Sequence, residues 1–296
     1  MQIHYTKSQK NLKTFCLLNY KNGKSFPKAR EESIVEYLQD INYSKLLSSP
    51  NNILGIEYLK ALKKYNSNIK PLIIERKDVG HLSYDYNGEF ASATAIRDLI
   101  LHQKKKDVKK YMTPSSYTIL SEEIANGHYV PDISFFEEII MYNLRTMSID
   151  EIANLPDVSE GLEYLIKKAA NSCNTINEFI NIVISKRYTE TRIRRILLYC
   201  LLRITKKDMS ISKKITPYIR VLGFNKNGEN LISKIKRYNP RANIITSVKK
   251  FENINTNKSL KMLLEKDIFA TNVYTLGFAK DSWSNLDYTK KMITYT

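Results

Sequence analysis

Two hydroxyls and an arginine stand at the start of a predicted helix in the stretch EFASATAIRDLI (89–100). With Ser92 as the N-cap, Thr94 falls in the first turn, and Arg97 follows three residues later on the same face. The first N–H groups of a helix have no intrahelical partner, so they can bind a phosphate. A cation near a helix N-terminus is unfavourable unless an anion lies beside it. The residues alone leave two interpretations open, a phosphate site and an ordinary capped helix.

A pair of asparagines and a second arginine have the chemistry of nucleotide contacts. Asn51 and Asn52 follow Pro50 at the start of a predicted helix that ends near Tyr65. Their amides both donate and accept, so they could read a base or ribose edge, although a helix cap is the commoner use. Arg76 ends the apolar stretch NIKPLIIER (68–76), which predicts a buried strand. Because ligands bind beyond the carboxyl ends of parallel strands, Arg76 is either a nucleotide contact or a structural ion pair.

The densest basic cluster lies in ISKRYTETRIRRILLYCLLRITKK (184–207), where apolar residues from Ile193 to Ile204 form one buried helix stripe. Its cations are Lys186, Arg187, Arg192, Arg194 and Arg195. Only Glu190 opposes them, and so many cations at a helix start oppose the dipole unless phosphates compensate. The alternative is a solvated charged face. The density of the cluster and the forked geometry of arginine favour RNA contact, with Tyr188 available for stacking on a base.

The composition supports a polyanionic partner. The 296 residues are 43% hydrophobic and carry a net charge of +17, from 47 Lys and Arg against 30 Asp and Glu. This excess favours nucleic acid, with a generally lysine-rich composition as the alternative. No apolar run is long enough to span a membrane, and the N-terminus lacks a secretory signal pattern, so a cytoplasmic location is expected. Three scattered cysteines and four unclustered histidines predict neither a disulfide framework nor a metal site.

The order of predicted elements divides the chain in two. A helix, a strand, a loop and a helix up to residue 113 are typical of a parallel α/β fold. Beyond Thr113, helical patterns dominate at about 115–126, 132–146, 159–171, 175–184 and 189–205, with Ser159 and Thr175 as predicted N-caps. From about 215 the pattern predicts a small α/β tail. There, Arg220 stands among apolar residues and is either a buried ion pair or a surface contact.

Five blocks in order resemble the bacterial tRNA(Met) cytidine acetate ligase family, which belongs to the HIGH-type nucleotidyltransferase-like superfamily. They are PNNILGIEYLKAL, SATAIR, SEGLE, KRYTETRIRRILL and YIRVLGFNKNG, and the similarity runs from about residue 23 to 278. The resemblance implies a Rossmann-like nucleotidyltransferase domain followed by a mostly helical domain. It also implies an enzyme that activates acetate with ATP, with magnesium, as acetyl-adenylate. That enzyme then acetylates N4 of the wobble cytidine of elongator tRNA-Met.

The resemblance also assigns roles to residues. One asparagine of the pair Asn51 and Asn52 matches an ATP-contacting position, as does Arg76, and Ser92, Thr94 and Arg97 would face the ATP phosphates. The basic helix around Arg192 would bind tRNA, an assignment that depends on charge more than on motif. The catalytic residues, the acetate pocket and the oligomeric state are not legible in the sequence.

One signature of the family is missing from the printed sequence. Family members carry H-x-G-H in the first half of the nucleotide domain, and these 296 residues contain none. The resemblance therefore implies an N-terminally truncated member. Residues 1–113 would be a partial nucleotide-binding domain, and residues 114–296 a helical, basic, tRNA-binding domain. ATP binding by the chain alone is expected to be weak, and the alternative function is that of a non-catalytic RNA-binding remnant.

Overall fold

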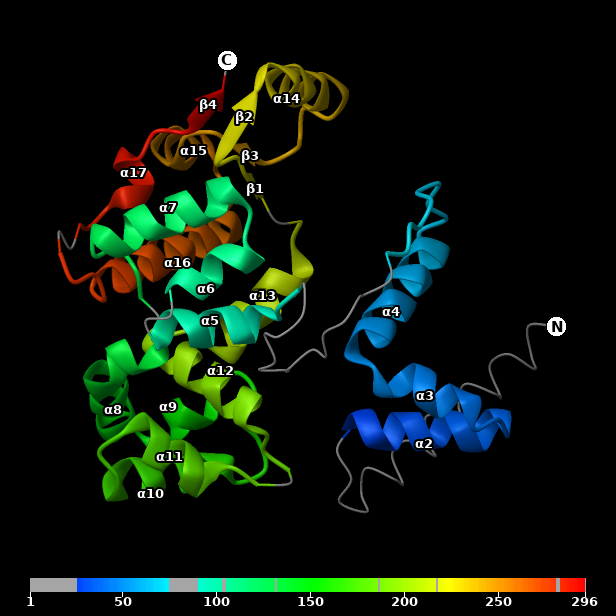
Figure 1. The fold of residues 1–296 in the computed structure, drawn as a ribbon, viewed down its shortest axis with the longest axis vertical. Coiled ribbons are helices and arrows are strands. Elements are labelled where there is room, and N and C mark those ends of the chain that lie inside the picture. The colour runs from blue at the N-terminus through cyan, green and yellow to red at the C-terminus, as the bar shows by residue number, and fades with distance from the viewer. Residues whose placement is uncertain are drawn as a thin grey trace. The chain divides into compact units, whose positions relative to one another are not determined.

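The computed structural model describes residues 26–74, 90–102, 105–130, 132–185, 187–216, 218–280 and 283–295. The chain divides into two compact units (Figure 1). The first unit comprises residues 1–77 together with 184–189, and the second comprises 78–183 together with 190–296. Helices dominate the described residues of both units.

The first unit contains the helices α2 (Phe26–Leu38), α3 (Asn42–Ser48) and α4 (Pro50–Lys64). Glu31 on α2 joins α2 to α3, since its carboxylate accepts hydrogen bonds from the hydroxyl of Ser44 at 2.5 Å and from the Nζ of Lys28 at 3.0 Å. These bonds hold the pKa of Glu31 below its usual value. Arg30 of α2 forms an ion pair with Glu57 of α4 at 2.7 Å. Polar bridges therefore link α2 to both α3 and α4.

The expected strand over 68–76 is not formed in its described part. Residues 67–74 have no regular secondary structure, and Leu72, Ile73 and Ile74 are each more than 80% exposed. A strand needs a neighbouring strand to satisfy its backbone groups, and no described strand pairs with this segment. The prediction of a buried strand is therefore wrong for residues 68–74. Arg76 lies outside the described residues.

The helical part of the second unit matches the predicted helices closely. The elements are α5 (Ala93–Leu101), α6 (Lys105–Val108), η1 (Lys109–Tyr111), α7 (Pro114–Ala125), η2 (Ile133–Phe136), α8 (Glu137–Thr146), α9 (Ile149–Ala153), α10 (Leu162–Ser172), α11 (Ile176–Val183), α12 (Glu190–Leu201), α13 (Lys206–Lys214) and α16 (Lys258–Thr275). Fully buried side chains of α8 to α12, among them Ile140, Ile166, Phe179 and Leu197, form its core. Helical spacing of these apolar residues is what made the elements legible.

The caps of these helices are partly as predicted. Thr175 caps α11, because its hydroxyl accepts a hydrogen bond from the N–H of Glu178 at 3.2 Å. The prediction of Ser159 as the cap of α10 is wrong. The N-cap of α10 is Gly161, whose φ of +84° suits a residue without a Cβ. Ser159 instead accepts a hydrogen bond from an arginine of α12, described below.

A small α/β tail completes the second unit, as the sequence predicted. Strand β1 (Ile219–Arg220) pairs in parallel with β3 (Ile244–Ile245), and β2 (Gly223–Asn225) pairs in parallel with β4 (Ile293–Tyr295). Helix α14 (Lys226–Tyr238) connects β2 to β3, and α15 (Val248–Ile254) and α17 (Leu286–Thr289) pack beside them (Figure 1). Ile245 and Val248 share a core with Leu264 and Ile268 of α16, which anchors the tail to the helical part.

Candidate nucleotide and RNA sites

Ser92 caps helix α5. Its side chain accepts a hydrogen bond from the N–H of Ala95 at 3.0 Å, and the residue is only 3% exposed. The capped-helix interpretation is therefore confirmed for this hydroxyl. The cap engages one first-turn N–H, so the N–H groups of Ala93 and Thr94 are left for an anion. The two interpretations of the stretch are thus compatible.

Arg97 and Thr94 share one face of α5, as their spacing predicted. A guanidinium nitrogen of Arg97 lies 3.5 Å from the hydroxyl oxygen of Thr94. Arg97 is exposed, and among the described residues no carboxylate lies within 4.0 Å of it. An arginine one turn from a helix N-terminus without an acidic partner carries a charge that an anionic ligand would compensate.

Asn51 and Asn52 lie in the first turn of α4 and are both exposed. Pro50 occupies the first helical position, and Ser49 is the N-cap without a side-chain capping bond. Neither asparagine is therefore the cap, contrary to the commoner interpretation of the pair. Their amides make no hydrogen bond to another described residue, so they remain available to a ligand.

The arginines of α12 have protein partners. Arg192 donates from Nε and from its terminal nitrogen to the carbonyl of Asp157 at 3.0 and 2.6 Å, and to the hydroxyl of Ser159 at 3.1 Å. Arg195 forms an ion pair with the carboxylate of Asp157 at 3.0 Å. Arg194 pairs with Glu190 one turn earlier at 2.8 Å. Oxygen atoms of the protein thus compensate the positive charge of these arginines, a role that the sequence analysis had assigned to phosphates.

The rest of the basic cluster lies in the first unit. Arg187 is exposed, whereas Lys186 falls outside the described residues. Tyr188 is only 9% exposed, so little of its ring is open for stacking on a base. That tRNA contacts the cluster stays a prediction, and Arg192 and Arg195 of α12 already bond to the 157–159 loop.

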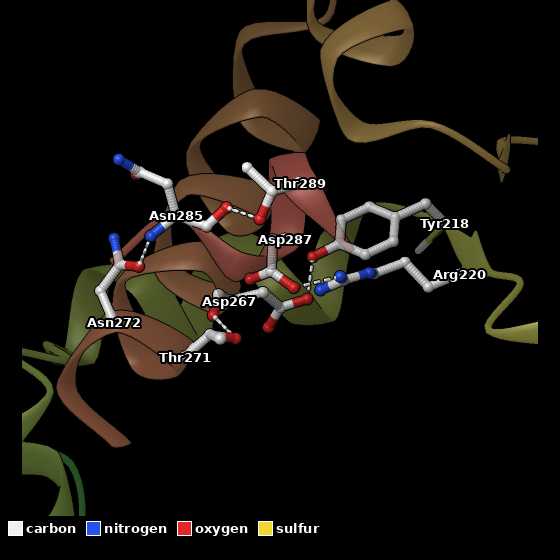
Figure 2. Close-up of polar contacts among 8 residues, drawn as sticks. All are labelled: Tyr218, Arg220, Asp267, Thr271, Asn272, Asn285, Asp287 and Thr289. Carbon is white, nitrogen blue, oxygen red and sulfur yellow. Dashed lines mark hydrogen bonds and ion pairs between the residues drawn. The ribbon is translucent and has the colours of Figure 1, made fainter. Parts of the chain in front are cut away.

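Arg220 resolves into the buried ion pair that was one of its two interpretations. It pairs with Asp287 of α17, and the side chains are 25% and 10% exposed (Figure 2). Beside it, Tyr218 donates a hydrogen bond to Asp267 of α16. Burial and this bond raise the pKa of Tyr218 far above its usual value, so it stays a donor. Two acids and their partners thereby tie β1 to α16 and α17.

The structure also shows a cationic groove that the sequence reasoning did not single out. It has a volume of about 460 Å³, and Lys236 of α14 and Lys250 of α15 line it. A signal was present, since nine Lys and Arg stand against two Glu over residues 226–261. The cluster at 186–195 is the more conspicuous signal, because it places five cations within ten residues.

The described residues contain no group of three His, Cys, Asp or Glu that could hold a metal ion. Cys173 and Cys200 are buried free thiols, and burial raises the pKa of Cys200 to about 12, while Cys16 is not among the described residues. None of the described helices is both long and apolar enough to cross a membrane.

Comparisons with known proteins place this geometry in a family. The HIGH Nucleotidyl Transferase family model matches residues 1–288. The tRNA(Met) cytidine acetate ligase of Halothermothrix orenii is 40% identical over 284 residues, covering 92% of this chain and 67% of that protein. The ligase of Caldanaerobacter subterraneus is 41% identical over 272 residues, covering 91% of this chain and 66% of that protein. The chain thus spans about two thirds of the length of these relatives.

Solved structures agree. Thermotoga maritima TmcAL in its apo form superposes with a TM-score of 0.88 at 27% identity, covering 96% of this chain and 70% of that one. TmcAL bound with alpha-thio ATP superposes with a TM-score of 0.85 at 26% identity, covering 97% and 70%. The fold is of the nucleotidyltransferase type, although helices dominate the described residues. The chain therefore belongs to the HIGH nucleotidyl transferase family and, within it, to the tRNA(Met) cytidine acetate ligases.

Proposed function

We propose that this chain is an ATP-dependent ligase that acetylates the wobble cytidine of elongator tRNA-Met. The observation that carries the proposal is the 40% identity to a tRNA(Met) cytidine acetate ligase across 92% of the chain. A structural neighbour with the same fold binds an ATP analogue, which supports ATP as the activating substrate. Because tRNA is the acceptor, a cytoplasmic location follows from the same proposal.

The reaction has two steps in which charge must be neutralised. A carboxylate oxygen of acetate attacks the α-phosphorus of ATP, and pyrophosphate leaves as acetyl-adenylate forms. The N4 amine of cytidine then attacks the acetyl carbonyl, AMP leaves, and the amine loses a proton. Neither step needs a protein nucleophile, so positioning and charge compensation supply the catalysis.

The proposed ATP contacts supply hydrogen-bond donors and positive charge. The free N–H groups at the start of α5, with Thr94 and Arg97, would hold phosphate oxygens, while Ser92 fixes the start of the helix. Asn51 or Asn52 would contact the base or ribose, and Arg76 would add a further cation. Magnesium would enter as the ATP complex, because the described residues offer no side-chain cluster for a metal and magnesium is commonly held through substrate phosphates.

The domain roles follow the chemistry of the two parts. Residues 1–113 would form the nucleotide-binding part, and residues 114–296 the part that holds tRNA. The nine Lys and Arg that stand against two Glu over residues 226–261 support the second role.

Acetyl transfer tests the proposal directly. The full chain is incubated with ATP, radiolabelled acetate and unmodified elongator tRNA-Met, and the tRNA is digested to nucleosides for mass spectrometry. We expect ATP-dependent N4-acetylcytidine, and none with a tRNA whose wobble cytidine is replaced by uridine. The proposal would be contradicted if the chain bound tRNA but showed neither acetylation nor acetate-dependent pyrophosphate exchange. That result would favour a non-catalytic RNA-binding protein.

A further inference from the structure

The cationic groove runs over the α/β tail where α14, the start of β3, α15 and the start of α16 meet. The residues that line it are Lys236, Ala242, Asn243, Ile244, Thr246, Ser247, Lys250, Phe251, Ile254, Asn255, Thr256, Asn257 and Leu260. None of them is acidic. The walls therefore combine positive charge with amide and hydroxyl groups, which is the donor set that phosphate oxygens bind.

The cations around the groove are unlike those of α12. Residues 226–261 are all described, and their Lys and Arg are Lys226, Lys234, Lys236, Arg237, Arg241, Lys249, Lys250, Lys258 and Lys261. None of these nine lies within 4.0 Å of a carboxylate of another described residue, in contrast to Arg194 and Arg195 of α12. Of the two acids in this range, Glu252 accepts a hydrogen bond from Tyr288 at 2.9 Å. The positive potential of the region is thus left for an outside anion.

Two asparagines of the groove present donors. The side-chain oxygen of Asn255 accepts a hydrogen bond from the N–H of Asn257 at 2.8 Å. The oxygen of Asn257 accepts from the N–H groups of Ser259 and Leu260 at 3.0 and 3.2 Å. These bonds fix the orientation of both amides, because the oxygen must face the backbone. Their NH₂ groups, which bond to no other described residue, then remain as donors beside the lysines.

A larger hollow of about 1000 Å³ adjoins the groove, and Thr246 and Ser247 line both. Its wall includes the rings of Tyr274, Phe278 and Tyr288. Cationic groups that follow a backbone, next to aromatic rings on which bases stack, are the combination that single-stranded nucleic acid requires. A simple polyanion without bases would use the lysines but would have no use for the rings.

We propose that the groove between α14 and α15 binds the phosphate backbone of tRNA, with Lys236 and Lys250 as phosphate contacts and an unstacked base in the adjoining aromatic hollow. The proposal deepens the proposed function, since it locates the surface that holds the acceptor RNA. It assigns this contact to a surface distinct from the arginine cluster of α12.

The test compares two double variants with equal loss of charge. Lys236→Gln with Lys250→Gln removes the groove lysines, and Lys109→Gln with Lys168→Gln removes two exposed lysines elsewhere in the second unit. Binding of fluorescent elongator tRNA-Met is measured by anisotropy at fixed salt. We expect the groove variant to raise Kd about tenfold or more, and the control about twofold or less, because only the former loses phosphate contacts. Unchanged thermal unfolding of both variants shows that the fold is retained.

Three outcomes would overturn the inference. One is an equal loss of affinity in the two variants, which would show that only overall charge matters. Another is an unchanged Kd in the groove variant. The third is binding of anionic phosphatidylserine vesicles that is tighter than tRNA binding and lost in the groove variant, which would indicate a membrane surface. The result is independent of acetyl transfer: an inactive chain that still binds tRNA through the groove would refute the proposed function and leave this inference standing.

Discussion

The arginine cluster of α12 and the lysines around the α14–α15 groove are both strongly basic, yet they use their charge differently. Arg192 and Arg195 are committed to Asp157, and Arg194 to Glu190. Lys236 and Lys250 have no acidic partner among the described residues. Charge density alone therefore does not identify a binding surface. A structural cluster differs from a surface open to an anion in that its cations already bond to oxygens of the protein.

Arg220 lies in the same α/β tail as the groove but pairs with Asp287. It therefore tests whether the role of a cation is set by its acidic partner or by its location in the tail. Replacing Arg220 with Gln leaves the carboxylate of Asp287, only 10% exposed, without its cation. We expect a loss of about 2 kcal/mol in the free energy of unfolding, below the range for a fully buried pair because Arg220 is partly exposed. Lys250→Gln, measured beside it in urea, should lose almost nothing. Equal free energies of unfolding for the two variants would contradict the distinction between paired and unpaired cations.

Arg97 should behave like the groove lysines, because no described carboxylate compensates it. Arg97→Gln should weaken ATP binding about tenfold, the effect of removing a charge-assisted phosphate contact, while the melting temperature stays the same. An NMR titration with ATP measures the dissociation constant of each variant. Lys168→Gln serves as the control. An unchanged ATP constant in Arg97→Gln would show that the cation serves another purpose.

Arg192 should behave in the opposite way. Arg192→Gln removes hydrogen bonds to Asp157 and Ser159, so we expect about 1 kcal/mol of stability to be lost. The affinity for tRNA should change less than threefold. Intact stability together with a tenfold loss of tRNA affinity would instead support the expectation drawn from the sequence, that this cluster contacts RNA.

The pair Arg195–Asp157 should show the smallest effect. Both side chains are partly exposed, at 49% and 37%, so solvent screens their attraction. A double-mutant cycle with Arg195→Gln and Asp157→Asn should give a coupling energy of about 0.5 kcal/mol that falls with added salt. Asn is the suitable replacement because residue 157 has a φ of +63°, which Asn tolerates. A coupling energy of zero at low salt would show that the carboxylate of Asp157 does not stabilise the protein through Arg195.

The sequence predicted most of what is local. Helical periodicity located α7, α8, α10, α11 and α12 but not the short α9, and capping chemistry identified Thr175 and the Ser92 cap. Both signals depend on residues that lie within a few positions of each other. The α/β tail was legible from its short apolar runs between turns.

What the sequence missed depends on long-range contacts. Asp157 lies 35 residues from Arg192, and Asp287 lies 67 residues from Arg220, so neither partner could be read beside its arginine. The stretch 68–74 has strand composition but no described partner strand. The groove brings α14, α15 and the start of α16 together. Its lysines stand out as an anion-binding surface only in the structure, which shows that no acidic residue lines the groove.

The salt dependence of tRNA binding tests the central distinction most directly. Each phosphate contact releases counterions, so the slope of log affinity against log salt counts the cations that touch phosphates. We predict that Lys236→Gln with Lys250→Gln flattens this slope by about 1.5 to 2, and that Arg192→Gln leaves it unchanged. A slope that is unchanged in the groove variant and flattened in Arg192→Gln would contradict the account.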